Sequence, residues 1–154
     1  MKTHTLIALL IGLLVFAACD SKVFYDETCR VDEQGWNMDD KLVYNIDVDD
    51  TAQTYLCCLD VRVRNDYPYS NIYFFLSTVY PNGDVAVDTN IEFQLAAPDG
   101  KWMGREQGRY VDGRYPFCYF RFPERGSYQF VLRHAMRDTL LRGVKDVGLH
   151  IEHK

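Results

Sequence analysis

The chain has 154 residues, of which 47% are hydrophobic, and a formal net charge of −5 at pH 7. This length suits one domain with a sizeable core. The acidic balance argues against a nucleic-acid partner, because phosphate binding needs a basic surface, and it gives no support to electrostatic binding at a membrane.

The first residues have the layout of an export signal. Lys2 supplies a positive start, and residues 6–15 are almost wholly apolar, a run shorter than the roughly 20 residues of a membrane-spanning helix. Residues 17–19, AAC, show the small-small-cysteine pattern of bacterial lipoprotein signals, although Phe16 stands where such signals usually carry leucine. We therefore expect a covalent diacylglycerol and an N-acyl lipid on Cys19 and no other cofactor; an ordinary secretory signal with a chance cysteine is the alternative.

Such lipids anchor a mature protein to a membrane of the cell envelope, since each buried CH₂ contributes about 0.8 kcal/mol. Asp20 follows the cysteine. In enterobacteria an Asp there favours the inner membrane, but other phyla do not follow that rule, and we favour the outer membrane. The expected organisation is a signal peptide at 1–18, a lipidated tether at 19–25 and a folded domain at 26–154.

Alternation of apolar and polar residues dominates the mature chain. It predicts half-buried strands at 42–48 and 55–65. The stretch 71–80 is apolar on both faces, which predicts a central strand. Turn signals, among them Asn82-Gly83, separate the further strands expected at 85–88, 91–96, 115–122, 127–134 and 146–152, and a short helix is expected at 135–141, before Gly143.

Short strands at this spacing predict an all-β fold, a single antiparallel β-sandwich of jelly-roll or immunoglobulin-like type behind the lipoprotein signal peptide. The order of the strands does not follow from one sequence. We therefore leave the two topologies open at this point.

Four cysteines remain after Cys19: Cys29, Cys57, Cys58 and Cys118. In an exported protein they allow three disulfide connectivities. Pairing the two adjacent cysteines with each other would strain the backbone, which leaves two. Buried free thiols acting as small apolar side chains are the alternative, and no metal site is expected, because no metal-ligand spacing accompanies them.

Motifs of catalysis are missing from the sequence. It has no nucleophile elbow, zinc-protease helix or phosphate loop, and we expect His134 and His150 to be surface or packed residues. The acidic clusters at 37–41 and 47–51 lack the glycine and terminal glutamate of a calcium loop. We therefore expect neither an enzyme nor a metal protein; a hydrolase with paired carboxylates is a third hypothesis.

Aromatic residues in predicted loops are candidate contacts for a partner. Tyr67 and Tyr69 flank Pro68, and Trp102 lies in a turn. Aromatic side chains on the loops of a rigid scaffold give large contact areas at low entropic cost. The alternative is that these rings cover the ends of the sandwich.

Several segments in order along the mature chain carry a family resemblance: 65–75, 80–104 with its PDGKWMG, 121–130, 135–137 and 146–152. With the lipoprotein cysteine before them, the sequence resembles the gliding motility lipoprotein GldH family of the Bacteroidota. The resemblance implies a membrane-anchored accessory protein of gliding, linked in part with type IX secretion, that acts through other envelope proteins. It brings no catalytic residues. A surface glycan-binding β-sandwich lipoprotein is the alternative function.

Overall fold

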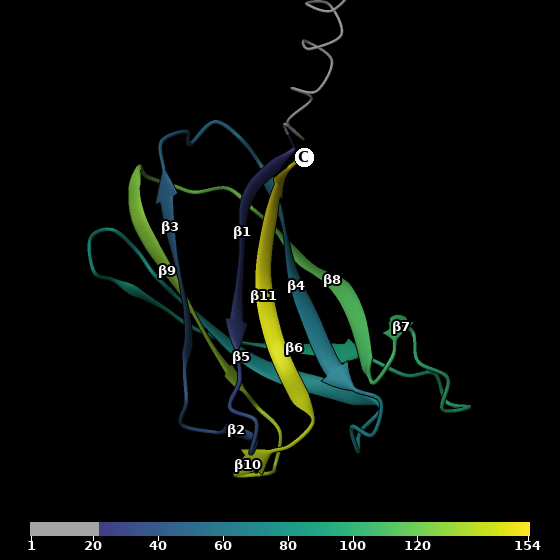
Figure 1. The fold of residues 1–154 in the computed structure, drawn as a ribbon. Helices are drawn as coiled ribbons and strands as arrows, with labels where there is room; N and C mark the ends of the chain where they lie inside the picture. Colours follow the sequence, from purple (N-terminus) through teal and green to yellow (C-terminus); the bar gives the residue numbers. More distant parts are fainter. Residues whose placement is uncertain (1–21) are drawn as a thin grey trace, which may run out of the picture.

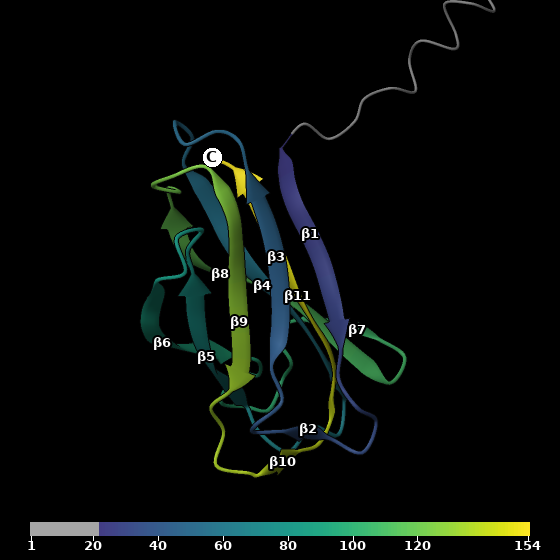
Figure 2. The ribbon, with the colours of Figure 1, turned by 90° about the vertical axis from the view of Figure 1, so that its left-hand side faces the viewer.

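The computed structural model describes residues 22–154, with the side chains of all of these except 87 and 88. Two antiparallel sheets pack face to face (Figures 1 and 2). The five-stranded sheet has the order β1-β11-β4-β8-β7, the four-stranded sheet has the order β3-β9-β5-β6, and β10 pairs with β2. The strands are β1 Val23–Arg30, β2 Trp36–Asn37, β3 Leu42–Val48, β4 Tyr55–Arg64, β5 Asn71–Val79, β6 Val85–Gln94, β7 Arg105–Gln107, β8 Tyr110–Phe120, β9 Gly126–His134, β10 Leu140–Leu141 and β11 Val144–His153.

The connections select between the two predicted topologies. Most connections cross from one sheet to the other. These are the connections β1 to β3, β3 to β4, β4 to β5, β6 to β7, β8 to β9 and β9 to β11. Two hairpins stay within one sheet: the long pair β5–β6 and the pair of the short strand β7 with β8. The all-β sandwich is thus confirmed, and its strand order is that of a jelly roll.

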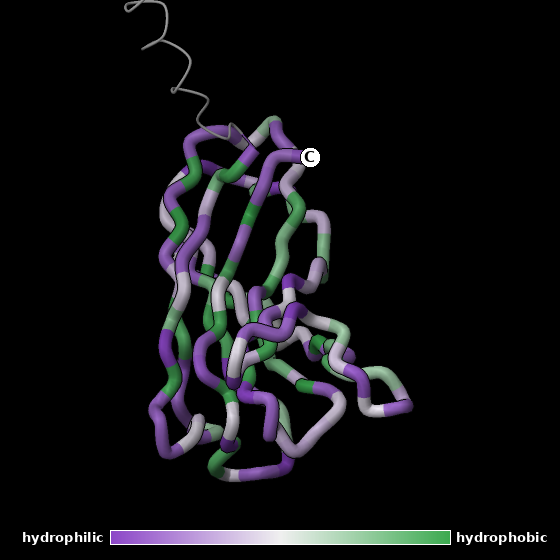
Figure 3. The backbone as a smooth tube through the Cα atoms, turned by 45° about the vertical axis from the view of Figure 1, so that its right-hand side comes forward, coloured by the Kyte–Doolittle hydropathy of each residue, from purple (hydrophilic) through white to green (hydrophobic). Residues whose placement is uncertain are grey.

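Alternation along the strands builds the core. In β3, Leu42, Tyr44, Ile46 and Val48 are buried, and the residues between them are exposed. The side chains of successive strand residues point to opposite faces, so each sheet turns one apolar face inward. The same alternation gives the mixture of green and purple segments along the tube in Figure 3.

Three local predictions were wrong. The sheet already begins at Val23, inside the expected tether, because β1 pairs along β11. Residues 85–94 form one strand instead of two, since β6 stays paired with β5 on either side of a bulge.

The expected helix at 135–141 is also absent from the described part of the chain. The backbone N–H of Ala135 donates to Tyr73 O at 2.7 Å, and Leu140 and Leu141 pair with β2. These long-range backbone hydrogen bonds outweigh a weak local helical preference. Residues 22–154 contain no helix long and apolar enough to span a membrane.

Candidate protein interface

One end of the sandwich lies close to the expected lipid anchor, and the other end lies far from it. Val23 at the start of β1 pairs with Glu152 near the end of β11, so the first strand begins beside the C-terminus (Figure 1). Cys19 lies outside the described residues, but four extended residues reach at most about 14 Å. We call this the anchor end, and we call the end that carries β2 and β10 the distal end.

Tyr67 does not lie on the surface. Its side chain is 5% exposed, its hydroxyl donates to Asn71 O at 3.2 Å, and burial raises the pKa of that hydroxyl. The ring packs edge-on against Tyr69, with 5.7 Å between the ring centres. The sequence offered Tyr67 as a candidate contact; in the structure its ring covers the end of the sandwich, as in the alternative interpretation.

Tyr69 lies beside it and is partly exposed, at 36%. Its hydroxyl donates to Asp138 Oδ2 at 2.7 Å, and this hydrogen bond raises the pKa of the phenol. The contact ties the 65–70 loop to the connection before β10. Tyr69 thus stays a candidate contact, but one with a partner inside the molecule.

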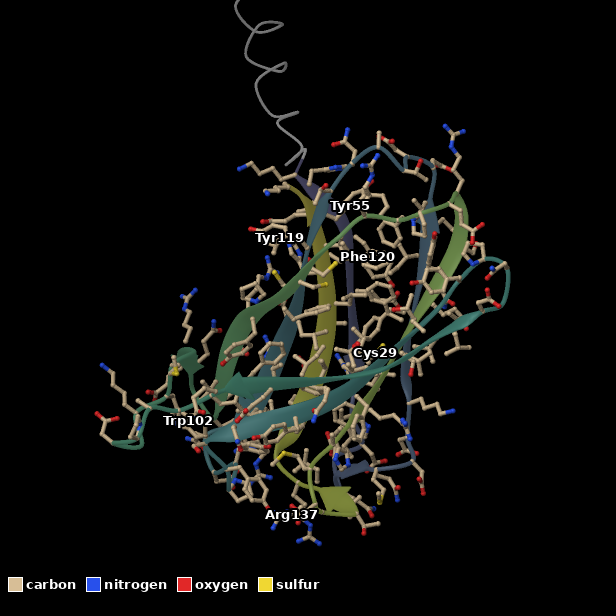
Figure 4. The ribbon with its side chains drawn as sticks, turned by 180° about the vertical axis from the view of Figure 1, so that it is seen from behind. Cys29, Tyr55, Trp102, Tyr119, Phe120 and Arg137 are labelled. Carbon is tan, nitrogen blue, oxygen red and sulfur yellow. The ribbon has the colours of Figure 1, made fainter. Side chains whose placement is uncertain are left out.

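Trp102 lies on a loop that projects sideways from the sandwich, whereas Arg137 lies at the distal end (Figure 4). The ring is half-buried against the core, and the backbone of Trp102 forms a bridge with Ala96. The next residue, Met103, is 62% exposed. The other tryptophan, Trp36, is buried, so only Trp102 can report a ligand that stacks on the surface.

The outer face of the five-stranded sheet carries a row of alternating charges. The register aligns one charged residue on each strand: Arg30, Asp146, Arg62, Asp112 and Arg105. Arg62 Nε lies 2.5 Å from Asp112 Oδ1, and Arg62 Nη1 lies 3.4 Å from Asp146 Oδ2. Opposite charges on neighbouring strands attract each other, so much of the charge of this face is neutralised within the molecule.

A second group on the same face resembles a metal site in its composition. Ligating atoms of Asp26, Asp60 and His150 lie within 4.8 Å of one another. However, Arg114 Nε and Nη2 donate to the two oxygens of Asp60, both at 2.7 Å, and His150 Nδ1 lies 2.7 Å from Asp26 Oδ2. The guanidinium already supplies the positive charge, so the group fits an ion-pair network better than a cation site.

The outer face of the four-stranded sheet is different. It carries apolar side chains that we call the valine–phenylalanine patch: Val43, Phe75, Val79, Val85 and Val131. Val43 is opposite Val131 and Val79 is opposite Val85, whereas Phe75 is opposite Arg133 and Asn90. Val85 is 62% exposed, and Val43 and Phe75 are each 37% exposed. A hollow of about 300 Å³ crosses the patch, with Lys41 and Arg133 in its lining. Contiguous exposed apolar residues rimmed by polar ones are typical of interaction sites.

The sequence contained a signal for this patch. The stretch 71–80 is apolar on both faces, and its position in the middle of a sheet was predicted. A central strand that is apolar on both faces is expected to be covered on both, but the structure leaves Phe75 37% exposed. Neighbouring strands bring particular outward residues side by side. Which residues these are depends on the register between the strands, and one sequence does not determine that register.

Comparisons with known proteins agree on one family. The profile of the GldH lipoprotein family matches residues 23–151. The chain is 30% identical over 148 residues to the gliding motility lipoprotein GldH homolog of Christiangramia forsetii, covering 91% of this chain and 90% of that protein. It is 31% identical over 157 residues to the gliding motility lipoprotein GldH of Flavobacterium johnsoniae, covering 96% and 95%.

Among solved structures, the chain is similar to part of a family GH115 4-O-methyl-α-glucuronidase. The TM-score is 0.45 and the sequence identity is 11%, over 86% of this chain and 18% of that chain.

Proposed function

This chain belongs to the GldH lipoprotein family, and we propose that it is a non-enzymatic, lipid-anchored envelope protein that supports gliding motility or the associated type IX secretion machinery by binding other proteins. The names of the two relatives support the link with gliding. The lipid on Cys19 attaches the domain to a membrane, with the outer membrane favoured.

The observation that carries the protein-binding role is the contrast between the two outer faces. The five-stranded sheet pairs its outward charges with one another, as the contact of Arg62 with Asp112 shows. The four-stranded sheet exposes Phe75, Val85 and Val43 on its outer face, where Val43 adjoins Val131 and Val85 adjoins Val79. Burying such apolar side chains contributes about 25 cal/mol per Å², so this face gains most from a partner.

The position of the patch also suits a partner in the envelope. Strands β3 and β9 of the four-stranded sheet run between the anchor end and the distal end (Figure 2), and β5 and β6 cross this direction obliquely (Figure 1). Their outer face therefore points sideways from the axis that joins the two ends. A protein anchored in the same membrane, or projecting along it, would meet this face directly.

The test is in-cell crosslinking, followed by pull-down of the tagged protein from solubilised membranes and mass spectrometry. It compares the unchanged chain with Phe75→Ser and with Tyr119→Ser. Tyr119 is 61% exposed and lies toward the anchor end (Figure 4), so its replacement removes an exposed aromatic ring from the five-stranded sheet.

We expect motility or secretion proteins with the unchanged chain and with Tyr119→Ser, and at least a several-fold loss of them with Phe75→Ser. Equal recovery from all three chains would exclude the patch as the binding face. Recovery of glycan transporters without motility or secretion proteins would contradict the proposed role.

A further inference from the structure

A cleft opens along one side of the sandwich, between β6 and β8. It exists because β6 is the last strand of its sheet and β7 pairs only with the first residues of β8. The cleft has a volume of about 560 Å³, and its lining includes the apolar side chains of Ile91, Phe93, Phe117, Phe120 and Phe130. Cys118 also lines the cleft and is partly exposed. A partly exposed cysteine therefore lies on the wall of a mainly apolar cleft.

A second thiol lies directly behind the first. Cys57 on β4 is opposite Cys118 on β8, and the two thiols hydrogen bond to each other. Directly opposed residues of an antiparallel pair have Cα atoms about 4.5 to 5.5 Å apart, which is within the roughly 4.4 to 6.8 Å that a disulfide spans. The pair is thus placed for a bond without a large backbone movement.

The other two cysteines of the described chain, Cys29 and Cys58, lie on opposite faces of the five-stranded sheet. Cys58 is opposite Pro116 and His150 and points to the outer face of the five-stranded sheet. Cys29 is opposite Val147, whose side chain is in the core. Since Cys29 and Cys58 lie on opposite faces of one sheet, neither expected connectivity forms completely.

We propose that Cys57 and Cys118 form a reversible disulfide across β4 and β8, by exchange with a disulfide that enters the cleft. The Cys118 thiolate attacks one sulfur of the incoming disulfide, forms a mixed disulfide and releases one thiolate. Cys57 then loses its proton and attacks Cys118 Sγ, which releases the second thiolate. The protein dithiol is oxidised, and the incoming disulfide is reduced to two thiols.

The environment of the pair favours this order of attack. The hydrogen bond from Cys57 lowers the pKa of the Cys118 thiol, whereas the same hydrogen bond and burial raise the pKa of Cys57. Nucleophilic attack requires the thiolate. Cys118, on the cleft wall, is therefore the attacking residue, and buried Cys57 is the resolving residue.

The test uses the full lipidated chain in detergent, treated with dithiothreitol or with oxidised glutathione and then alkylated and mapped by mass spectrometry. Because Cys57 and Cys58 are adjacent, mapping uses the Cys58→Ser variant, which keeps the pair and removes the ambiguity. We expect oxidised glutathione to remove two thiols and to give a peptide that joins Cys57 to Cys118, with Cys29 still alkylated.

A second variant tests the order of attack. Cys57→Ser should retain glutathione on Cys118 as a mixed disulfide that no second thiol resolves, while Cys29→Ser should behave as the unchanged chain. Failure of the Cys58→Ser chain to form the 57–118 bond, or a bond that joins Cys29 or two chains instead, would overturn the proposal. The result for the Cys58→Ser chain tests the proposal even if Cys57→Ser does not fold.

Discussion

Phe75 and Arg133 face each other across β5 and β9, with the Arg133 guanidinium carbon 5.8 Å from the centre of the Phe75 ring. A cation over an aromatic ring at an exposed site contributes about 0.5 to 1 kcal/mol. The contact holds the ring in place on the sheet, yet 37% of Phe75 is exposed. The residue thus offers an ordered apolar surface that the fold itself does not use.

Stability measurements should separate this surface role from a core role. Phe75→Ala should lower the free energy of unfolding by about 1 kcal/mol, because the ring is partly solvated and loses mainly the contact with Arg133. The adjacent Phe74 is fully buried, and Phe74→Ala should cost about 3 to 5 kcal/mol. Urea unfolding of both variants checks this; equal costs would show that Phe75 supports the core.

The charge row on the five-stranded sheet should contribute modestly and in a salt-dependent way. Arg62 contacts both Asp112 and Asp146, but its side chain is 45% exposed, so solvent screens the pairs. Arg62→Gln should therefore lower the free energy of unfolding by about 1 kcal/mol in dilute buffer, and by less at molar salt. A loss that is unchanged by salt would show that packing, and not charge, accounts for it.

His134 should make stability depend on pH. Its side chain is buried, its Nε2 lies 3.0 Å from Trp36 O, and its Nδ1 has no hydrogen-bond partner among the described residues. Burial lowers the pKa of this imidazole, and this effect outweighs the opposite effects of the hydrogen bond to Trp36 O and of the charge of Asp138. At acidic pH the unfolded chain therefore binds a proton at His134 that the folded chain does not bind. The free energy of unfolding falls as the pH drops below the unfolded pKa of about 6.5.

The matched variant His134→Gln lacks this titration. The stability of the unchanged chain relative to the variant should decline between about pH 8 and about pH 5, by at most about 1.4 kcal/mol per pH unit. Denaturant unfolding at several pH values measures the difference. A difference that is constant with pH would contradict a neutral, buried His134.

The sequence predicted the fold class and most strands because alternation reports directly on which residues are buried. The strand at 42–48 was predicted with its bounds. The first strand was missed because its residues VFYDETCR carry polar and charged groups on both faces, as suits a strand at the edge of a sheet. The prediction of a helix at 135–141 was wrong because Ala135 bonds to Tyr73 and Leu140 and Leu141 pair with β2, both far away in the sequence.

The site was less predictable than the fold, since it depends on long-range register. Tyr67 and Trp102 were predicted to lie in loops, as they do. The burial of Tyr67 and the partial burial of Trp102 do not follow from the local sequence. The opposition of Cys57 and Cys118 depends on how β4 pairs with β8. The count of cysteines alone left several pairings open.

The lipid anchor should be necessary for membrane attachment. Cys19→Ser removes the sulfur that is expected to carry diacylglycerol, and the domain should then move to the soluble envelope fraction, because no acyl chains would hold it on the membrane. Fractionation and labelling with a radioactive fatty acid measure this, with Cys58→Ser as the control. A Cys19→Ser chain that stayed wholly with the membranes would contradict the lipoprotein assignment.

The most direct test of the protein-binding role is site-specific photocrosslinking on the membrane-attached protein in living cells. A photoreactive amino acid is placed at Val131 within the patch or at Tyr119 on the five-stranded sheet, and the adducts are identified by mass spectrometry. We predict that position 131 crosslinks to one or a few motility or secretion proteins and that position 119 does not. No adduct from position 131, or the same adducts from both positions, would contradict the account.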